Sequence, residues 1–275
     1  MYFFQVRHAL LPSPALAKPD QSKTRRLKPA LLPGYTVKPT GSLHLIPVGM
    51  GEAPPDTWLP HAVQELAGRL KVYIAENAKT ARAFLKQIGT VLPLQEITIH
   101  TLNDKVDAQQ MRQWLTPLLS GEEIGLVSEA GCPAVADPGA KVVAVAHAMG
   151  IRVVPWVGPS SILLSLMASG LDGQRFAFHG YAPIEPGERT KQLKSWEIDS
   201  QKQHQTQILI ETPYRNGAMF DTLKQALKGN TRVCIARALT TSDEWIQTHT
   251  VSEWKTRPVP DLNKKPTIFL FLAGQ

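Results

Sequence analysis

The sequence predicts an α/β protein of two subdomains, the first built on a mostly parallel sheet and the second on a mixed sheet. Two observations support this fold. In the first half of the folded region, short apolar segments of strand length alternate with segments that carry apolar residues at helical spacing, which is typical of parallel sheets with helices on both faces. In the second half, the strand segments around Ile246 and Thr267 leave no room for a helix between them, which indicates antiparallel pairing.

The elements of the first half are assigned from periodicity. Continuous apolar runs such as Ile-Gly-Leu-Val predict strands buried on both faces, whereas apolar residues three and four positions apart predict helices. The expected strands are Ser42–Val48, Lys71–Glu76, Glu96–Leu102, Glu123–Ser128 and Arg152–Val157, and the expected helices are Leu59–Leu70, Thr80–Ile88, Gln109–Leu119 and Lys141–Met149.

Gly158-Pro159 breaks this alternation, and we therefore place the subdomain boundary there, which gives residues 41–157 and 158–275. The second subdomain has fewer helical segments between its strands. Its expected strands are Phe176–Tyr181, Gln207–Glu211, Arg232–Ala238, Ile246–Val251 and Thr267–Leu272, and its expected helices are Ser161–Ser169, Lys191–Trp196 and Asn216–Leu227.

Composition predicts a soluble globular protein of the cytoplasm. Hydrophobic residues make up 43% of the 275 residues and charged residues 19%, and no apolar stretch approaches the ~20 residues of a membrane-spanning helix. The two cysteines, Cys132 and Cys234, fit free thiols in a reducing compartment better than one disulfide. The histidines and cysteines show no zinc-ligand spacing, so no metal is expected.

The positive charge is concentrated before the fold. The formal net charge is +7, yet residues 1–40 hold seven of the basic residues and only Asp20 as an acid, whereas residues 41–275 carry 23 basic and 22 acidic groups. The first 40 residues are also rich in proline and lack periodicity, so we interpret them as an extension outside the fold. A solvated arm is the favoured reading, and a phosphate-binding arm or a transit peptide are the alternatives.

The segment Val127–Gly139, VSEAGCPAVADPG, is the most informative motif. It follows a buried strand, and ligands of open α/β sheets bind at the carboxyl ends of strands. Its glycines allow a ligand to approach the backbone, and its prolines stiffen the loop. The alternative is a plain strand-helix connection with Asp137 as helix cap and Pro138 as the first helical residue. We expect that capping role and, in addition, a binding role for residues 128–131.

Two further segments surround glycine-containing turns. Pro47–Gly51 follows the first strand, but Gly-x-Gly alone fits a tight turn as well as a ligand loop. Pro155–Ser161 lies at the subdomain junction, where a helix N-terminus would direct free N–H groups and the hydroxyls of Ser160 and Ser161 toward a cleft. One of these serines is expected to cap the helix.

A fourth segment, Glu211–Arg215, ends a strand of the second half. Charged and aromatic side chains at the carboxyl end of a strand suit the wall of a cleft. The alternative is an ordinary helix start with Thr212 as cap and Pro213 at the first helical position.

Together, VSEAGCPAVADPG and RVVPWVGPSSILLSLMASGL resemble the tetrapyrrole-methylase superfamily, and within it the branch of small-subunit ribosomal RNA 2′-O-ribose methyltransferases acting on cytidine. Glu211–Arg215 is similar to the ESPHR segment of that branch, and Ala236–Thr240 to its AREL(T) segment. The likeness extends from Gly41 to Gly274. The residues that match the two long motifs are Ser128, Ala130, Gly131, Pro133, Asp137, Pro138, Gly139, Gly158, Pro159, Ser160, Ser169 and Gly170.

The resemblance implies a two-domain tetrapyrrole-methylase-like fold that binds S-adenosylmethionine in the cleft between its domains, as a homodimer. It implies that the cofactor is held largely by backbone groups of the first-strand loop, the VSEAGCP loop and the GPSS junction. The implied cofactor contacts are Pro47, Gly49, Ser128, Glu129, Ala130, Gly131, Pro133, Val135, Pro159, Ser160, Ser161, Pro213, Ala238 and Leu239.

Three departures from the family pattern concern the acceptor of the methyl group. The family's AEDTR segment is Ala75–Lys79 here, with Asn77 in place of an acid. The aspartate of the SDAGT segment is Glu129, and its threonine is Cys132. A paralogue with a different acceptor therefore remains an alternative.

Methyl transfer requires alignment of the acceptor with the sulfonium methyl group, and a hydroxyl acceptor gains from a nearby base. Glu76 is the first candidate base and Glu129 the second, because both end strands at the predicted cleft edge. Phosphate or carboxylate groups of a substrate would suit Arg215 and Arg237, with intramolecular salt bridges as the alternative. The candidate substrate-binding residues are Asn77, Arg82, Tyr214, Arg215 and Arg237.

Three functional hypotheses follow from the sequence. The first is 2′-O-ribose methylation of small-subunit ribosomal RNA, with the small ribosomal subunit as partner. The second is methylation of a tetrapyrrole or another small molecule, whose carboxylates would also suit arginines. The third is an interaction protein that binds S-adenosylmethionine without catalysis.

Overall fold

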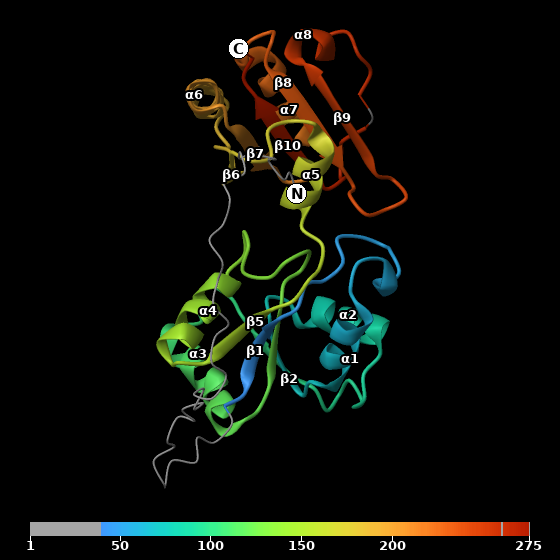
Figure 1. Ribbon diagram of the computed structural model, residues 1–275, viewed down its shortest axis with the longest axis vertical. Helices are drawn as coiled ribbons and strands as arrows, with labels where there is room; N and C mark the ends of the chain where they lie inside the picture. Colours follow the sequence, from blue (N-terminus) through green and yellow to red (C-terminus); the bar gives the residue numbers. More distant parts are fainter. Residues whose placement is uncertain (1–39, 260, 275) are drawn as a thin grey trace, which may run out of the picture. The chain divides into compact units, whose positions relative to one another are not determined.

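The computed structural model describes residues 40–259 and 261–274, and it contains two five-stranded sheets (Figure 1). Both sheets belong to one compact unit that extends from Lys38 to the C-terminus. Apart from Thr40, the predicted basic extension lies outside the described residues. The predicted α/β fold, with one parallel and one mixed sheet, is confirmed.

The first sheet is entirely parallel, in the strand order β3-β2-β4-β1-β5. Helices connect most of its strands, as the alternating pattern predicts. Its strands are β1 Ser42–Leu45, β2 Val72–Ala75, β3 Thr98–Thr101, β4 Ile124–Val127 and β5 Arg152–Pro155, and its helices are η1 Pro55–Thr57, α1 His61–Arg69, α2 Ala78–Ile88, α3 Ala108–Leu115, η2 Thr116–Ser120 and α4 Gly139–Ala148.

Helices cover both faces of this sheet: α1 and α2 lie on one side and α3 and α4 on the other (Figure 1). The period of two along each strand explains the division. In β2, Tyr73 and Ala75 pack with α1 and α2, whereas Ile74 between them packs with α3 and α4. Because both faces are buried, the central strands β2 and β4 are apolar, whereas the edge strands β3 and β5 carry polar residues and are partly exposed.

Gly125 in β4 gives Tyr73 the room that its ring needs. A Cβ atom at Gly125 would lie 2.4 Å from Cε1 of Tyr73, whose hydroxyl donates a hydrogen bond to the Ala67 carbonyl and therefore fixes the ring. We expect Gly125→Ala to lower the free energy of unfolding by about 1–3 kcal/mol through overpacking, measured by urea denaturation. Gly217→Ala is the matched control, because nothing lies within 4 Å of its added Cβ. Equal stabilities of the Gly125→Ala variant and the wild type would contradict this account.

The second sheet is mixed, in the order β6-β7-β10-β8-β9. Only β6 and β7 pair in parallel, and the other neighbours are antiparallel. Its strands are β6 Phe176–Tyr181, β7 Thr206–Ile210, β8 Arg232–Arg237, β9 Trp245–Thr250 and β10 Thr267–Leu272, and its helices are α5 Ser161–Ser169, α6 Pro186–Gln203, α7 Asn216–Ala226 and α8 Val251–Trp254.

The prediction of antiparallel pairing is confirmed, but its reason was wrong. The short helix α8 fits between β9 and β10, and these two strands are not neighbours, because β8 lies between them. The antiparallel partners of β10 are β7 and β8. The amino end of β10 therefore lies at the same sheet edge as the carboxyl ends of β7 and β8.

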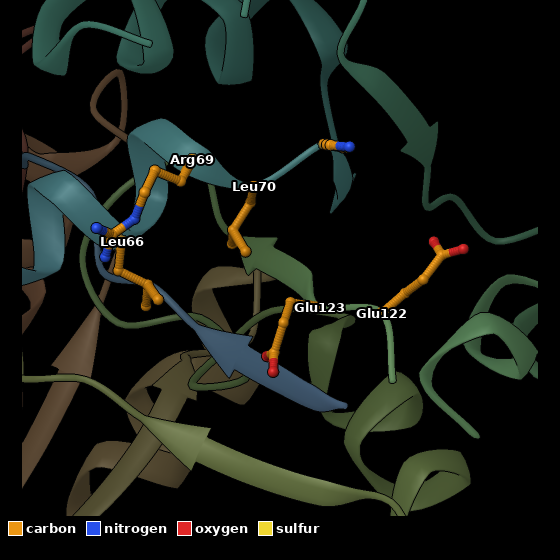
Figure 2. Close-up of a pocket in the computed structure, with 6 residues that line it drawn as sticks. Leu66, Arg69, Leu70, Glu122 and Glu123 are labelled. Carbon is orange, nitrogen blue, oxygen red and sulfur yellow. The ribbon is translucent and has the colours of Figure 1, made fainter. Parts of the chain in front are cut away.

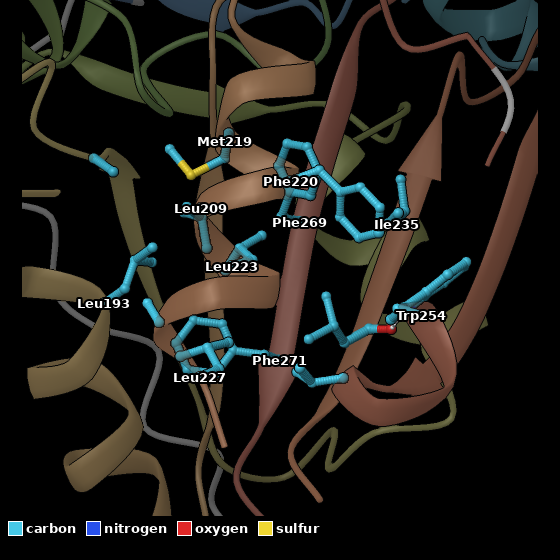
Figure 3. Close-up of a cluster of buried hydrophobic side chains, with 14 of the residues drawn as sticks. Leu193, Leu209, Met219, Phe220, Leu223, Leu227, Ile235, Trp254, Phe269 and Phe271 are labelled. Carbon is cyan, nitrogen blue, oxygen red and sulfur yellow. Dashed lines mark hydrogen bonds between the residues drawn. The ribbon is translucent and has the colours of Figure 1, made fainter. Parts of the chain in front are cut away.

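The second sheet separates two apolar clusters. In β10, Phe269 and Phe271 pack with α6, α7 and α8 (Figure 3), whereas Ile268 and Leu270 pack with α5 on the opposite face. Helix α5 therefore belongs to the second sheet, although it directly follows the predicted junction at Gly158-Pro159.

Several predicted bounds differ from the structure. β1 ends at Leu45 instead of Val48, and α1 begins at His61 because Pro60 occupies its N-cap. The largest difference is α6, predicted over residues 191–196 but extending from Pro186 to Gln203. Glu185 caps this helix by accepting hydrogen bonds from the N–H groups of Gly187 and Glu188, a start signal in a segment whose many charges hide the apolar periodicity.

Over residues 40–259 and 261–274, no helix is long and apolar enough to cross a bilayer. The same residues contain no group of three or more histidine, cysteine or acidic side chains placed to hold a metal ion. Cys132 and Cys234 are both free thiols.

Candidate active site

Three loops that the sequence singled out meet at the carboxyl edge of the first sheet. Val48, after β1, and Gly131, after β4, exchange two backbone hydrogen bonds of 3.0 and 3.1 Å. The Cys132 thiol lies 3.3 Å from the Pro159 carbonyl and donates to it, which ties the β4 loop to the segment before α5. Burial raises the pKa of this thiol, so it remains a protonated donor. Cysteine thus connects the loops at the position of the family's threonine.

The loop after β4 is held in a defined shape by its own polar groups. The Ser128 hydroxyl donates to the carbonyls of Ala130 and Gly131, both at 3.2 Å. The Asp137 carboxylate accepts hydrogen bonds from the N–H groups of Ala134 and Gly139 at 2.9 and 2.7 Å. Asp137 therefore holds the first amide of α4, as predicted, although Pro138 sits at the N-cap and not at the first helical position.

Two residues with left-handed backbone flank Val135 in this loop, Ala134 at φ 67° and Ala136 at φ 61°. The same arrangement recurs after β8, where Ala238 at φ 50° and Thr240 at φ 66° flank Leu239. Non-glycine residues rarely adopt this conformation, and such strain is concentrated at functional sites.

A cleft lies between these loops and the edge of the second sheet. It consists of two adjoining cavities of about 190 and 280 Å³, which share lining by Met50, Ala130, Ser161, Ile210 and Pro266. The lining is mostly apolar with a few polar groups, which is typical of cofactor sites. Of the predicted cofactor contacts, those that line the cleft are Ala130, Gly131, Val135, Ser160, Ser161, Pro213 and Leu239.

The other predicted cofactor contacts do not line these cavities: Pro47, Gly49, Ser128, Glu129, Pro133, Pro159 and Ala238. Ser128 and Pro159 instead connect the loops through the hydrogen bonds described above. Ser160 occupies the N-cap of α5 as expected, but its side chain makes no capping hydrogen bond.

Sequence reasoning missed most of the second-sheet wall. Tyr181, Ile210 and Ala236 are at or near the carboxyl ends of their strands, which was the available signal, whereas Phe178 lies in the middle of β6. Thr267 and Ile268 line the cleft from the amino end of β10, and only the antiparallel direction of this strand brings them there. Glu211, Met50 and Cys132 also line the cleft from segments that the sequence singled out, although they were not named as contacts. The remaining lining residues that were not predicted are Ala136, Ile162 and Pro266.

Three carboxylates interact at the edge of the first sheet. The pKa of Glu76 is raised above its ordinary value by burial, and further by the negative charges of Asp137 and Glu129. Burial also raises the pKa of Asp137, against the opposing effect of its hydrogen bonds from Gly139 and Ala134. Glu76 directly follows Ala75, which pairs with Val127 of β4, so it ends its strand beside the β4 loop as expected.

The predicted substrate-binding residues are dispersed. Asn77 caps α2, its side-chain oxygen accepting a hydrogen bond from the Lys79 N–H at 2.9 Å, and Arg82 is exposed on that helix. Arg237 donates to the backbone carbonyls of Asp261 and Asp243 at 3.0 and 2.9 Å. Asn77 and Arg237 thus form hydrogen bonds within the protein, and Arg82 is exposed to solvent. The roles of all three in substrate binding stay predictions.

Arg215 forms an ion pair with Glu211, with both Nε and Nη2 donating to Oε1 at 3.0 and 2.6 Å. The salt-bridge alternative therefore describes its contacts. The Glu211 side chain is fully buried, and its second oxygen, Oε2, has no hydrogen-bond partner among residues 40–259 and 261–274. The alternative of a helix start at Thr212 and Pro213 was wrong, because α7 begins at Asn216 with Arg215 at its N-cap.

Another cavity, of about 460 Å³, lies at the opposite, amino-terminal edge of the first sheet (Figure 2). Leu66, Arg69 and Leu70 line it from the end of α1 and the residue after it, and Glu122 and Glu123 from the residues before β4. It contains none of the predicted site residues. Because ligands of parallel sheets bind at the carboxyl ends of strands, we assign the active site to the cleft at the other edge.

Among known proteins, a solved structure shares the fold of this chain, and curated relatives show its family. The solved structure of the methyltransferase CobJ has a similar fold, with a TM-score of 0.55 over 85% of this chain and 95% of that chain at 17% sequence identity. The fold is thus shared with a protein that is a methyltransferase. No family model matches the chain.

Curated relatives define the family. Ribosomal RNA small subunit methyltransferase I of Xylella fastidiosa is 30% identical over 237 residues, which are 85% of this chain and 81% of that protein. The protein of the same name from Neisseria meningitidis is 30% identical over 224 residues, 82% of this chain and 72% of its own length. The chain therefore belongs to the ribosomal RNA small subunit methyltransferase I family, and it is a methyltransferase. The resemblance predicted from the motifs is confirmed.

Proposed function

We propose that this methyltransferase transfers a methyl group from S-adenosylmethionine to a ribose 2′-hydroxyl of small-subunit ribosomal RNA. The observation that carries the proposal is the cleft assembled from three interlocked loops in a chain whose relatives are named ribosomal RNA small subunit methyltransferases. The name of the relatives supports the RNA acceptor, and the geometry supports the cofactor.

The residues of the cleft fit the chemical groups of S-adenosylmethionine. Ser160, Ser161 and Ile162 line it at the start of α5, where the first helical N–H groups lack intrahelical partners and favour a carboxylate. Met50, Ile210 and Pro266 provide apolar walls for the adenosyl portion. When bound, the cofactor supplies an electrophilic methyl group on a sulfonium.

Glu76 is the proposed general base. A ribose hydroxyl loses its proton as the new bond forms, and a carboxylate accepts that proton more readily when its pKa lies closer to the working pH. Burial and two neighbouring carboxylates raise the pKa of Glu76 in that direction. Glu129 is more exposed and acts through its charge on Glu76.

The test is transfer of a labelled methyl group to undermethylated small ribosomal subunits. A 2′-O-methyl group blocks attack of that oxygen on the neighbouring phosphate, so the bond between the methylated nucleotide and the next one survives alkaline hydrolysis of the RNA. The label is therefore expected in a dinucleotide that alkali does not cleave. Label on a base would contradict the ribose assignment. Transfer to an added tetrapyrrole and not to RNA would support the second hypothesis, and cofactor binding with no transfer would support the third.

The proposed enzyme is a homodimer that acts in the cytoplasm, where its ribosomal substrate is found.

The proposed dimer interface is the exposed apolar face of α5. Leu163 and Met167 lie one turn apart on this helix with 52% and 79% of their surface exposed, and Val157 before the helix is 74% exposed. Exposed apolar side chains that share one helix face favour burial against a second copy. We expect Met167→Glu to convert the dimer to monomer in sedimentation velocity, whereas Val91→Glu, at an exposed site away from α5, leaves it dimeric. A wild-type monomer would refute the dimer.

A further inference from the structure

Two exposed tyrosines stand at the edge of the cleft that the second sheet forms. Tyr181 ends β6 and is 59% exposed, and Tyr214 follows β7 and is 76% exposed. Tyr181 pairs in register with Ile210, the last residue of the parallel neighbour β7, and Tyr214 follows Ile210 by four residues, so both tyrosines lie at the carboxyl edge of these two strands. In the described part of the chain, no other aromatic ring stacks on either of them.

Each of the two rings lines a cavity. Tyr181 lines the cleft itself, together with Glu211 and Pro213. Tyr214, the next residue after Pro213, lines a separate cavity of about 400 Å³. Its charged groups are Lys224, Asp221 and Asp261, and Lys224 is paired with Asp221 at 2.9 Å, so this cavity carries no excess of positive charge. The cleft and this second cavity are therefore lined by consecutive residues of the chain, Pro213 and Tyr214.

Charge alone offers little affinity for RNA on the described part of the chain. Residues 41–275 carry 23 basic and 22 acidic groups, and the arginines nearest this edge are held by Glu211 and by backbone carbonyls. Sequence-tolerant binding of unpaired nucleotides can instead come from base stacking on aromatic side chains, which requires exposed rings such as these.

We propose that Tyr181 and Tyr214 form a stacking platform for unpaired bases of the RNA, on either side of the nucleotide that is methylated. This inference rests on the proposed function, because it assigns the RNA-binding residues of the same site. Tyr181 holds a base at the mouth of the cleft, and Tyr214 holds a base over the neighbouring cavity. The platform orients the unpaired strand so that one ribose enters the cleft.

The experiment measures binding of the wild-type chain and its variants to undermethylated small ribosomal subunits by filter binding. Tyr214→Ala should raise the Kd about 5- to 150-fold, the range for loss of one stacked base, and Tyr214→Phe, which keeps the ring, should not. Phe176→Ala is the matched control, since Phe176 is a partly exposed aromatic residue at the opposite end of β6. The affinity for S-adenosylhomocysteine, measured by calorimetry, should be the same in the Tyr214→Ala variant and the wild type.

Salt dependence separates stacking from charge. The ratio of the Kd values of Tyr214→Ala and wild type should be equal at low and high salt, because stacking releases no counterions. The proposal is overturned if Tyr214→Ala binds subunits with the affinity of the wild type. It is also overturned if the substitution weakens binding of S-adenosylhomocysteine as much as it weakens binding of subunits, because that result indicates a structural defect. A wild type that binds subunits through these rings but transfers no methyl group would refute the proposed function and leave the platform standing.

Discussion

Replacing Gly131 with arginine is expected to abolish binding of S-adenosylmethionine and of S-adenosylhomocysteine. Gly131 has a φ of 71°, lines the cleft, and is hydrogen-bonded to Val48. A Cβ atom there would lie 3.4 Å from the Pro159 carbonyl oxygen and 3.7 Å from the Met50 sulfur, so a longer side chain must enter the cleft or push these loops apart. Isothermal titration calorimetry with both compounds measures the effect.

Gly131→Ala is the control for the backbone strain that both substitutions introduce. Its methyl group would make ordinary contacts, so the variant loses about 1–2 kcal/mol to the left-handed backbone but keeps the cleft open. We expect weakened, measurable binding from the alanine variant and none from the arginine variant, with both proteins folded by circular dichroism. Binding of S-adenosylhomocysteine to folded Gly131→Arg with wild-type affinity would place the cofactor elsewhere.

The second large effect is expected from Glu76→Gln. Loss of a general base should reduce kcat for methyl transfer by about 10²–10⁴-fold, while the Kd for S-adenosylhomocysteine stays unchanged, because Glu76 does not line the cofactor cavities. Single-turnover transfer to small ribosomal subunits gives the rate. A Glu76→Gln variant with the wild-type rate would remove Glu76 from the mechanism.

The pH dependence tests the same assignment. A base must be ionised, so activity should fall as the pH decreases through the pKa of Glu76, which is raised above the ordinary glutamate value by burial, Asp137 and Glu129. Glu129→Gln removes one of the negative charges that raise this pKa, and the acidic limb should therefore move to lower pH. Asp137 is unsuitable for this test because it also holds the Ala134 and Gly139 amides. A limb that stays in place would contradict the coupling of Glu76 and Glu129.

The fold was predictable where burial leaves a pattern. The central strands β2 and β4 of the first sheet are apolar because helices cover both faces, and the alternation of strands and helices predicted the parallel topology. The long helix α6 was predicted at a third of its length or so, since its apolar contacts, such as Leu193 and Trp196, are separated by many charged residues. The strand order in the second sheet depends on pairing between segments that are distant in sequence. Hydrophobic periodicity indicates where a strand lies in the sequence, but not which strand it pairs with.

The site was predictable from its loops and less so from its opposite wall. Gly131, Val135 and Ser161 stand in motifs that follow strands, and they do line the cleft. Thr267 and Ile268 begin an unremarkable apolar strand, and they reach the cleft only because β10 runs antiparallel to β7. The ion pair between buried Glu211 and partly exposed Arg215 was one of two alternatives that the sequence left open.

The left-handed residues around Val135 and Leu239 bear on how quickly a ligand is captured. Each of these four non-glycine positions costs the folded chain roughly 1–2 kcal/mol, a cost that glycine would avoid. Glycine would also enlarge the range of shapes open to each loop, and that range would have to be narrowed again during every binding event. With alanine and threonine at these positions, the folded chain is less stable, but each loop has fewer conformations available to it. The rate of ligand association would then be set by diffusion of the ligand into a preformed cleft, and not by rearrangement of the loops.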